Sequence, residues 1–189
     1  MDVKDAIIKR RAYRSLDPVE ITETVIKDLA ECAQLAPSCK NSQPWKFIFL
    51  KDPEQLQKIF TTLTPANKWV ENASMVIIVF SKTEDGCIIK ERLYYLYETG
   101  LATAFILLRA TELGLVAHPI AGFEETKIKS LFKIPALMKV ISLIVIGKRK
   151  NMIDPDLSDL IKYSERTRPS RKQLKEFVYL NSYNSVIKL

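Results

Sequence analysis

Two compact groups of arginines are the side chains of this sequence best suited to hold an anion. Arg10, Arg11 and Arg14 stand near the N-terminus, and Arg166 and Arg168 stand just ahead of a proline. A guanidinium presents a planar fork of N–H donors that matches the oxygens of a phosphate group. Basic residues in the last turn of a helix also favour its dipole, so the first group fits a structural role as well.

The glycines provide no other way to hold a phosphate. The sequence has five of them, and none is spaced as G-x-G-x-x-G or as a P-loop. Neither a Rossmann dinucleotide site nor a Walker nucleotide site is supported, because both need glycines where the backbone approaches the phosphates. A phosphate bound by this chain must therefore be held by arginines.

A polar segment from Ala36 to Trp45 reads Ala-Pro-Ser-Cys-Lys-Asn-Ser-Gln-Pro-Trp. Ser38, Asn41 and Gln43 bring hydroxyl and amide groups that both donate and accept hydrogen bonds, and two prolines restrict the backbone. This mixture suits the uracil-like edge and ribityl chain of a flavin. It suits equally well a rigid turn whose amides bond their own backbone.

Cysteine and histidine offer few options for catalysis. Cys32, Cys39 and Cys87 include no C-x-x-C pair, so their spacing supports neither a disulfide framework nor a zinc site. His118 is the single histidine. A Ser-His-Asp hydrolase or Cys-His protease would rest on that one residue, and a histidine-rich metal centre is excluded. We expect no metal.

The charge balance makes an anionic partner plausible without identifying it. The net charge is +7, and basic residues gather at 9–11, 148–150 and 166–172. These clusters fit a solvated basic surface, a nucleic-acid site or a phosphorylated cofactor. No RNP-type strand, zinc-finger spacing or recognition helix is found. A flavin-free basic module that binds nucleic acid or an acidic protein stays an alternative.

The apolar segments fit a cytoplasmic protein. Apolar residues make up 47% of the chain and charged residues 27%, as in ordinary globular domains. The apolar run at residues 75–80 is too short to cross a bilayer. The first residues open into a charged amphipathic stretch without the apolar core of a signal peptide, so we expect a cytoplasmic location.

The elements that must position these residues follow from periodicity and caps. Thr22 is a good N-cap, and Gly114 fits the position after a helix. Residues 101–108 are apolar all round, which predicts a helix buried centrally or packed against another subunit. The patterns predict helices over residues 2–11, 22–35, 53–60, 88–113 and 124–132, and strands over 45–51, 74–81, 140–146 and 177–180. Helices and strands mix without regular βαβ alternation, which predicts an α+β fold.

Several of these segments together resemble the nitroreductase family. Residues 10–14 read Arg-Arg-Ala-Tyr-Arg, and they and the 36–47 block look like the family's two N-terminal signatures. A segment like residues 117–123 follows the long helix in the family, then a strand ending near a glycine such as Gly147, then a basic pair before proline. All occur here in the same order, over roughly residues 6–177.

The resemblance implies a homodimer with two FMN sites at the subunit interface. Its α+β fold has a central, mostly antiparallel sheet surrounded by helices, with a C-terminal strand exchanged between subunits. We therefore expect a single FMN-binding domain over 1–189, whose extension from about residue 166 reaches toward the partner. The apolar run at 177–180 is costly to leave in water, which favours the exchange; a mobile terminus is the alternative.

By position, the resemblance also implies which residues contact FMN. Arg10 would serve the phosphate or the ribityl chain, Arg14 the pyrimidine end, and residues 119–122 the dimethylbenzene-to-N5 side. Residues 37–41 would reach the flavin from the partner subunit. The implied contacts are Arg10, Arg11, Ala12, Arg14, Pro37, Ser38, Cys39, Asn41, Asn67, Lys68, Pro119, Ile120, Ala121, Gly122, Arg166 and Arg168.

The implied chemistry belongs to the cofactor. FMN accepts a hydride at N5, and a cation near N1 and C2=O stabilises the reduced ring. Arg14 is the candidate cation, with Asn67 or Lys68 as weaker helpers, and no side chain is needed as nucleophile or base. The resemblance implies oxidation of NADH or NADPH and reduction of nitroaromatics, quinones or similar acceptors by a ping-pong scheme. The same fold and FMN could instead serve dehydrogenation, dehalogenation or flavin fragmentation.

Some positions depart from the family pattern. Ala12 stands where many relatives have serine, and Ala121 where some have glutamate, so only its backbone carries over. Cys39 replaces a small residue and is either an inert contact or an oxidisable one. We expect Glu98 to be a structural partner of a basic residue, and His118 to pack or line the pocket rather than act as an acid.

Overall fold

The computed structural model describes residues 1–183 and 185. Contacts between residues divide the chain into two units, Met1–Leu157 and Ser158–Leu189, and each is described by itself. The division falls a few residues before position 166, where the C-terminal extension was expected to begin. A single domain over the whole chain stays a prediction.

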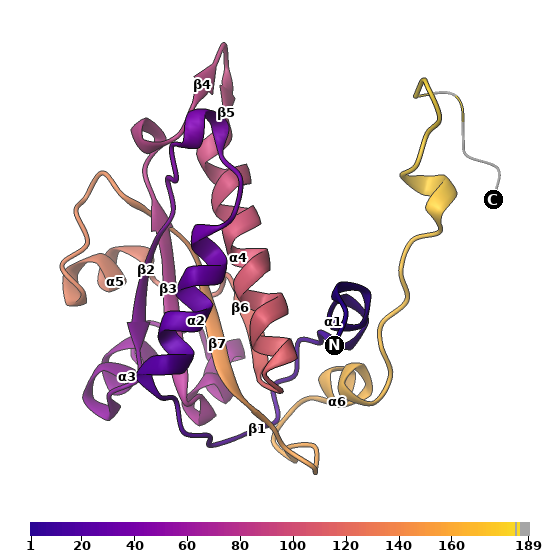
Figure 1. The fold of residues 1–189 in the computed structure, drawn as a ribbon. Coiled ribbons are helices and arrows are strands. Elements are labelled where there is room, and N and C mark those ends of the chain that lie inside the picture. Colours follow the sequence, from indigo (N-terminus) through magenta and orange to yellow (C-terminus); the bar gives the residue numbers. More distant parts are fainter. Residues whose placement is uncertain (184, 186–189) are drawn as a thin grey trace. The chain divides into compact units, whose positions relative to one another are not determined.

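A five-stranded sheet forms the centre of the first unit (Figure 1). Its order is β1-β7-β3-β2, and β6 also pairs with β7. Every pairing is antiparallel, which confirms the predicted α+β fold with an antiparallel sheet. The strands are β1 (Leu16–Asp17), β2 (Lys46–Leu50), β3 (Met75–Ser81), β6 (Val116–Ile120) and β7 (Lys139–Arg149).

The middle of the sheet is apolar on both faces. All seven residues of β3 are buried, as the continuous apolar run predicted. Alternate β3 residues, Met75, Ile77 and Val79, belong to the core that includes Ala102 and Ile106 of the long helix α4. The residues between them face the other side, because successive side chains of a strand alternate.

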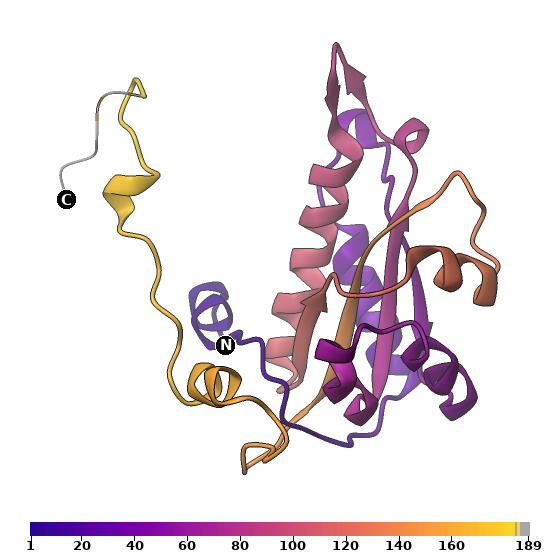
Figure 2. The same cartoon turned by 180° about the vertical axis from the view of Figure 1, so that it is seen from behind.

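Helices cover both faces of this sheet. The helices are α1 (Val3–Lys9), α2 (Glu23–Gln34), α3 (Pro53–Phe60), α4 (Tyr94–Glu112) and α5 (Glu125–Leu131). Helices α2 and α4 pack together on one face of the sheet (Figure 1). Helices α3 and α5 and the 3-10 helix η2 (Pro65–Asn72) lie on the other face, which Figure 2 shows from behind. The predicted caps are confirmed, since Thr22 Oγ1 accepts the N–H of Val25 at 3.3 Å and Gly114 has a φ of 77°.

The start of the long helix was predicted too early. Residues 88–93 form a hairpin of β4 (Ile88–Ile89) and β5 (Arg92–Leu93), and α4 begins at Tyr94. Lys90, in the hairpin turn, has a φ of 56°, a left-handed conformation that no helix contains. Apolar periodicity did not reveal the turn, because the hairpin carries isoleucines as a buried helix would.

Strand β6 was not predicted as a strand. Pro119 lies within it and cannot donate a hydrogen bond to a neighbour, so a strand containing it belongs at a sheet edge. The structure agrees, because among the described residues β6 pairs only with β7.

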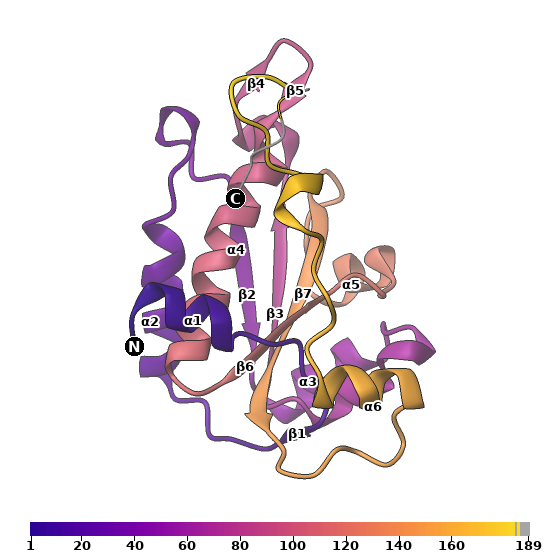
Figure 3. The same cartoon turned by 90° about the vertical axis from the view of Figure 1, so that its right-hand side faces the viewer.

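The second unit contains α6 (Asp159–Arg166) and the 3-10 helix η4 (Leu174–Glu176). The predicted strand at 177–180 is absent from this unit as described: Phe177 instead ends η4 in a turn, after a capping box between Gln173 and Glu176. Figure 3 shows this segment in yellow. Strand exchange with a partner stays a prediction, and its part at residues 184 and 186–189 falls outside the described residues.

A search of the described helices for a bilayer-spanning segment finds none of sufficient length and hydropathy.

Candidate functional site

The N-terminal arginines lie on the segment that connects α1 to β1. Arg10 caps the C-terminus of α1, where its N–H donates to the carbonyl of Ala6 at 2.9 Å. The guanidinium carbon of Arg11 lies 5.0 Å from the ring centre of Tyr13, and that of Arg149 lies 4.3 Å from the same ring. Arg149, at the end of β7, thus joins the predicted group. Its only signal in the sequence was the basic cluster at 148–150.

The next residues of this segment meet η2 and β6. The guanidinium carbon of Arg14 lies 5.7 Å from the ring centre of Trp69, a cation–π contact. His118 stacks on the same indole, with ring centres 4.7 Å apart. Its Nδ1 lies 3.0 Å from the carbonyl oxygen of Tyr13, which can only accept, so Nδ1 donates. His118 is buried and packs as expected.

Hydrogen bonds from η2 and its N-cap residue hold the turn that follows β6. The carbonyl of Gly122 accepts the Nδ2 amide of Asn67 at 3.0 Å and the N–H of Thr64 at 3.2 Å. A Cβ built on Gly122 would lie 2.5 Å from Asn67 Nδ2 and 2.6 Å from Thr64 Oγ1. A larger residue at position 122 would displace these two side chains, and the close approach brings two predicted site segments together. The amide of Asn67 holds the turn, while the neighbouring Lys68 is exposed.

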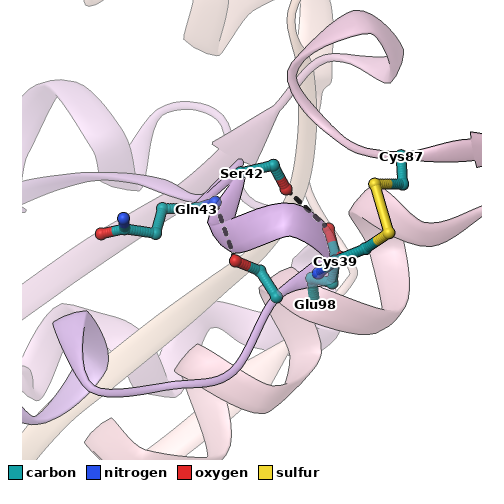
Figure 4. Close-up of a disulfide and its surroundings, with 6 residues drawn as sticks. Cys39, Ser42, Gln43, Cys87 and Glu98 are labelled. Carbon is teal, nitrogen blue, oxygen red and sulfur yellow. Dashed lines mark hydrogen bonds between the residues drawn. A yellow bond between two sulfur atoms is a disulfide. The ribbon is translucent and has the colours of Figure 1, made fainter.

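Hydrogen bonds to a carboxylate on α4 hold the polar loop that follows α2. Glu98, fully buried, accepts the N–H of Cys39 at 2.7 Å and the hydroxyl of Ser42 at 3.4 Å (Figure 4). The expectation that Glu98 pairs with a basic residue is corrected, because these two partners are neutral donors from the loop. A carboxylate that accepts a backbone N–H is a strong hydrogen bond, so Glu98 orders the start of the 3-10 turn η1 (Cys39–Asn41).

Other polar groups of this loop bond their own backbone. Ser38 Oγ accepts the N–H of Gln43 at 3.0 Å, and the Gln43 side chain donates to the carbonyl of Asn41 at 3.3 Å. Lys40, Asn41 and Gln43 have φ values of 54°, 57° and 46°. The loop is therefore a rigid turn, and Asn41 is exposed in it.

A disulfide joins Cys39 to Cys87, with the Cα atoms 5.9 Å apart (Figure 4). This corrects the expectation drawn from cysteine spacing, since the two residues are 48 apart in the sequence. The pairing depends on tertiary structure: a Cβ on Gly86 would lie 2.6 Å from Cβ of Tyr95, so glycine lets the segment before Cys87 approach α4. Cys32 is free.

The predicted residues of the first unit form two groups at opposite ends of the sheet (Figure 1). The polar loop ends beside Ser81, the last residue of β3, whose hydroxyl donates to the carbonyl of Pro44. The arginine segment leads into β1, which pairs with Arg149 at the far end of β7. One chain therefore does not bring these groups together. Arg166 and Arg168 lie in the second unit and are not placed relative to either.

The remaining predicted residues lie beside these contacts. Ala12 is in the segment before β1, Pro37 follows α2, and Pro119 and Ile120 end β6. The carbonyl of Ile120 accepts the hydroxyl of Ser142 at 3.0 Å, and Ala121 leads to the Gly122 turn. The indole Nε1 of Trp69 is buried and has no hydrogen-bond partner among the described residues. It leaves one donor available at this cluster.

An apolar cavity of about 420 Å³ lies elsewhere, between α1, α2 and α4. Its lining includes Val3, Cys32, Leu35 and Phe105 and none of the residues predicted to contact a flavin. Burial and the neighbouring carboxylate of Asp28 raise the pKa of Cys32. Within the part of the chain that the structure describes, no cluster of three metal-ligating side chains occurs.

Comparison with known proteins shows what this arrangement is similar to. The sequence model of the nitroreductase family matches residues 7–66 and 62–148. A relative from Methanothermobacter thermautotrophicus, named NADH dehydrogenase/NAD(P)H nitroreductase, is 31% identical over 86% of this chain and 88% of its own. A nitroreductase family protein from Clostridium novyi NT has a TM-score of 0.74 at 26% identity, covering 98% of this chain and 97% of its own. A structure titled as an oxidoreductase containing FMN has a TM-score of 0.82 at 25% identity, covering 98% and 94%.

Proposed function

The chain belongs to the nitroreductase family, and we propose that it is an FMN-dependent oxidoreductase that takes a hydride from NADH or NADPH. Its acceptors are nitroaromatics, quinones or similar electron-poor compounds. The observation that carries the proposal is the cluster in which Arg14, Trp69 and His118 stack beside the turn at Gly122. The names of the Methanothermobacter relative and of the FMN-containing oxidoreductase support it.

The donors of this cluster fit FMN. Arg10 and Arg11 offer guanidinium groups to a phosphate, Arg149 stands beside Arg11 on the Tyr13 ring, and Trp69 has an unused buried N–H. When bound, FMN supplies a hydride acceptor at N5. Arg166 and Arg168 complete the phosphate site in this proposal.

The chain's own residues act by position and charge. Arg14, held over an indole, supplies a fixed cation for the pyrimidine end of the isoalloxazine, where negative charge develops on reduction. Asn67 and Thr64 fix the turn at residues 121–122, whose backbone we assign to the N5 side. No nucleophile or general base is required, and the nicotinamide and the acceptor occupy one pocket in turn.

The second half of each site comes from another copy of the chain. Within one chain the polar loop and the arginine segment lie at opposite ends of the sheet, so Pro37, Ser38, Cys39 and Asn41 are assigned to the flavin of a partner. A homodimer is also favoured by exposed apolar side chains on α1 and α4, which include Val3, Ile7, Ile8, Leu96, Tyr97 and Phe105. The extension from residue 166 exchanges between the two copies.

Flavin reconstitution tests the proposal. The purified protein is loaded with FMN and passed over a desalting column, and the retained flavin is measured from its visible absorbance. Arg10→Ala should weaken FMN binding, because a hydrogen bond to a charged group contributes about 1.5–3 kcal/mol, roughly 10- to 100-fold in Kd. Lys4→Ala, which removes an exposed cation from α1, is the matched control.

Two outcomes would contradict the assignment. Unchanged flavin content in both Arg10→Ala and Arg168→Ala would overturn the phosphate site. A colourless wild-type protein that gains no FMN would overturn the function itself, and would favour a basic binding module if the protein bound DNA with a steep salt dependence.

A further inference from the structure

The disulfide connects two segments that differ in how firmly they are held. Cys87 follows Gly86, whose backbone lies against Tyr95 of α4. Just before it, Asp85 bonds the ammonium of Lys46 on β2 at 2.6 Å and that of Lys82 at 3.3 Å. The Cys87 end of the bond is therefore anchored to both a strand and a helix of the core.

The Cys39 end belongs to the strained polar loop. Three residues without the freedom of glycine, Lys40, Asn41 and Gln43, have left-handed φ values there. Such conformations are unfavourable and persist only where surrounding contacts enforce them. Hydrogen bonds within the loop support this conformation. From outside the loop, Glu98 of α4 accepts two hydrogen bonds from it, and the disulfide joins Cys39 to Cys87 (Figure 4).

Neither cysteine of the disulfide is fully buried. We therefore expect a small dithiol to reach the bond in the folded protein. Disulfide cleavage would remove the covalent link between the loop and the anchored Cys87, and would leave the strained conformation held by hydrogen bonds alone.

We propose that the Cys39–Cys87 disulfide is a redox-responsive bond that holds residues 38–43 in their flavin-binding conformation, so that its reduction lowers the affinity for FMN. The predicted change in FMN affinity rests on the proposed function, because it requires this loop to contact the flavin. The predicted change in the conformation of the loop is independent of that function.

The reaction is a thiol–disulfide exchange with a dithiol. A thiolate of the dithiol attacks one sulfur of the pair, which breaks the Cys39–Cys87 bond, forms a mixed disulfide and releases the other cysteine as a thiolate. The second thiol of the reductant then displaces the bound cysteine. In sum, two electrons and two protons pass to the protein, which gains two thiols, and the reductant is oxidised to a cyclic disulfide. Cys32, which lies on α2, is not part of this disulfide.

The test compares the oxidised protein with the same protein in excess dithiothreitol. Alkylation and mass measurement should count one free thiol before reduction, that of Cys32, and three after it. Hydrogen exchange of the peptide covering residues 38–43 should accelerate. If reduction leaves about a tenth of the molecules with the loop in its binding conformation, the Kd for FMN rises about tenfold, and it recovers on reoxidation.

Two variants separate the bond from other effects of the reductant. Cys87→Ser removes the anchored cysteine and leaves every proposed flavin contact in place, so it should show the fast exchange and weak FMN binding without reductant and no further response to it. Cys32→Ser should respond as the wild-type protein does, because Cys32 lies outside the disulfide.

Three results would overturn the proposal. The free-thiol count could stay at one in excess dithiol, the count could reach three with unchanged loop exchange and unchanged Kd, or Cys87→Ser could match the oxidised wild type. A protein that binds no FMN in either state would refute the proposed function instead. The exchange of residues 38–43 would then decide by itself whether the bond controls the loop.

Discussion

Single ionic contacts show how individual residues anchor the parts of this site. Asp85 is bonded by Lys46 and Lys82, and its side chain is only 21% exposed. Burial by itself would raise the pKa of Asp85, but hydrogen bonds and charges from the two lysines outweigh it and place the pKa below the ordinary 3.8. The folded protein therefore holds this carboxylate ionised where the unfolded chain has begun to bind a proton.

This shift predicts an acid-dependent contribution to stability. A lowered folded pKa means that stabilisation is complete above the unfolded pKa and is lost as the pH falls through the folded value. At neutral pH, Asp85→Asn should reduce the free energy of unfolding by about 0.5–1 kcal/mol, the range for partly exposed ion pairs. Below pH 3.8 the curves of the two proteins should converge.

Urea unfolding at a series of pH values measures this difference. Glu84→Gln changes an exposed neighbour and should stay within about 0.5 kcal/mol of the wild type. A difference between Asp85→Asn and the wild type that persists unchanged at pH 2–3 would contradict the assignment.

The role of a residue was predictable from the sequence where the local backbone alone determines that role. Thr22 as a cap and Gly114 after a helix follow from local backbone chemistry, and both are confirmed. Trp69 and Arg149 had no comparable signal, because their stacking depends on segments more than fifty residues apart. The prediction that Glu98 pairs with a basic residue was wrong for the same reason, because its partners come from a loop more than fifty residues away.

Among the elements, the hairpin before α4 depends on one glycine. The backbone of Gly86 passes so close to α4 that a Cβ would lie 2.6 Å from Tyr95 Cβ and 2.8 Å from its Cα and N. Those atoms belong to a helix and cannot move away as a flexible side chain could. The approach also brings Cys87 to Cys39.

We therefore expect Gly86→Ala to destabilise the protein by about 1–3 kcal/mol, the cost of overpacking at a site that cannot relax. The matched control is Gly100→Ala, in the middle of α4, where an added Cβ meets nothing within 4 Å. It should be neutral or stabilise by roughly 0.5–1 kcal/mol, because alanine loses less entropy in a helix. Thermal and urea unfolding measure both, and equal effects of the two substitutions would refute this account.

Helices and strands with a strong sequence pattern were predicted correctly, and those with a weak pattern were missed. The apolar runs of β3 and β7 and the capped helices were found, although β7 is longer than predicted. The hairpin at 88–93 and strand β6 were missed, since one resembles a helix in composition and the other contains Pro119. The tail at 177–180 was read as a strand from its apolar residues. It does not form one within the described chain, and its pairing with a partner's sheet stays a prediction.

For the whole molecule, the surface of α1 and α4 points to a second copy of the chain. Phe105 of α4 lines the 420 Å³ cavity beside α1, and Ile7 and Ile8 of α1 are more than half exposed. Exposed apolar side chains on two neighbouring helices favour an interface at this surface. The proposed shared flavin site calls for the same partner, because the two predicted site groups lie at opposite ends of one chain's sheet.

Charge placed on this surface should therefore separate the copies and empty the flavin site. Ile7→Glu should shift the protein from dimer to monomer in sedimentation experiments and reduce the retained FMN in parallel. Leu137→Glu, at an exposed leucine between α5 and β7, should leave both unchanged. A monomeric wild type, or a monomeric variant with full flavin content, would contradict the shared site.

The α+β class was predictable because the order of helices and strands follows from the pattern of the whole chain, whereas the antiparallel sheet was expected only from the family resemblance. The site was predictable only as two lists of residues, which one chain holds at opposite ends of its sheet. In the proposed homodimer a second chain completes the site, and the pattern of this sequence does not show where that chain docks.

The most direct test of the central claim is anaerobic stopped-flow mixing of the FMN-loaded protein with NADH and, separately, with NADPH. We expect at least one of them to bleach the visible flavin absorbance in a single phase, and a quinone or nitroaromatic added afterwards to restore it. A bound flavin that neither nicotinamide bleaches would contradict the proposed reaction and would favour one of the other flavin reactions on the same fold.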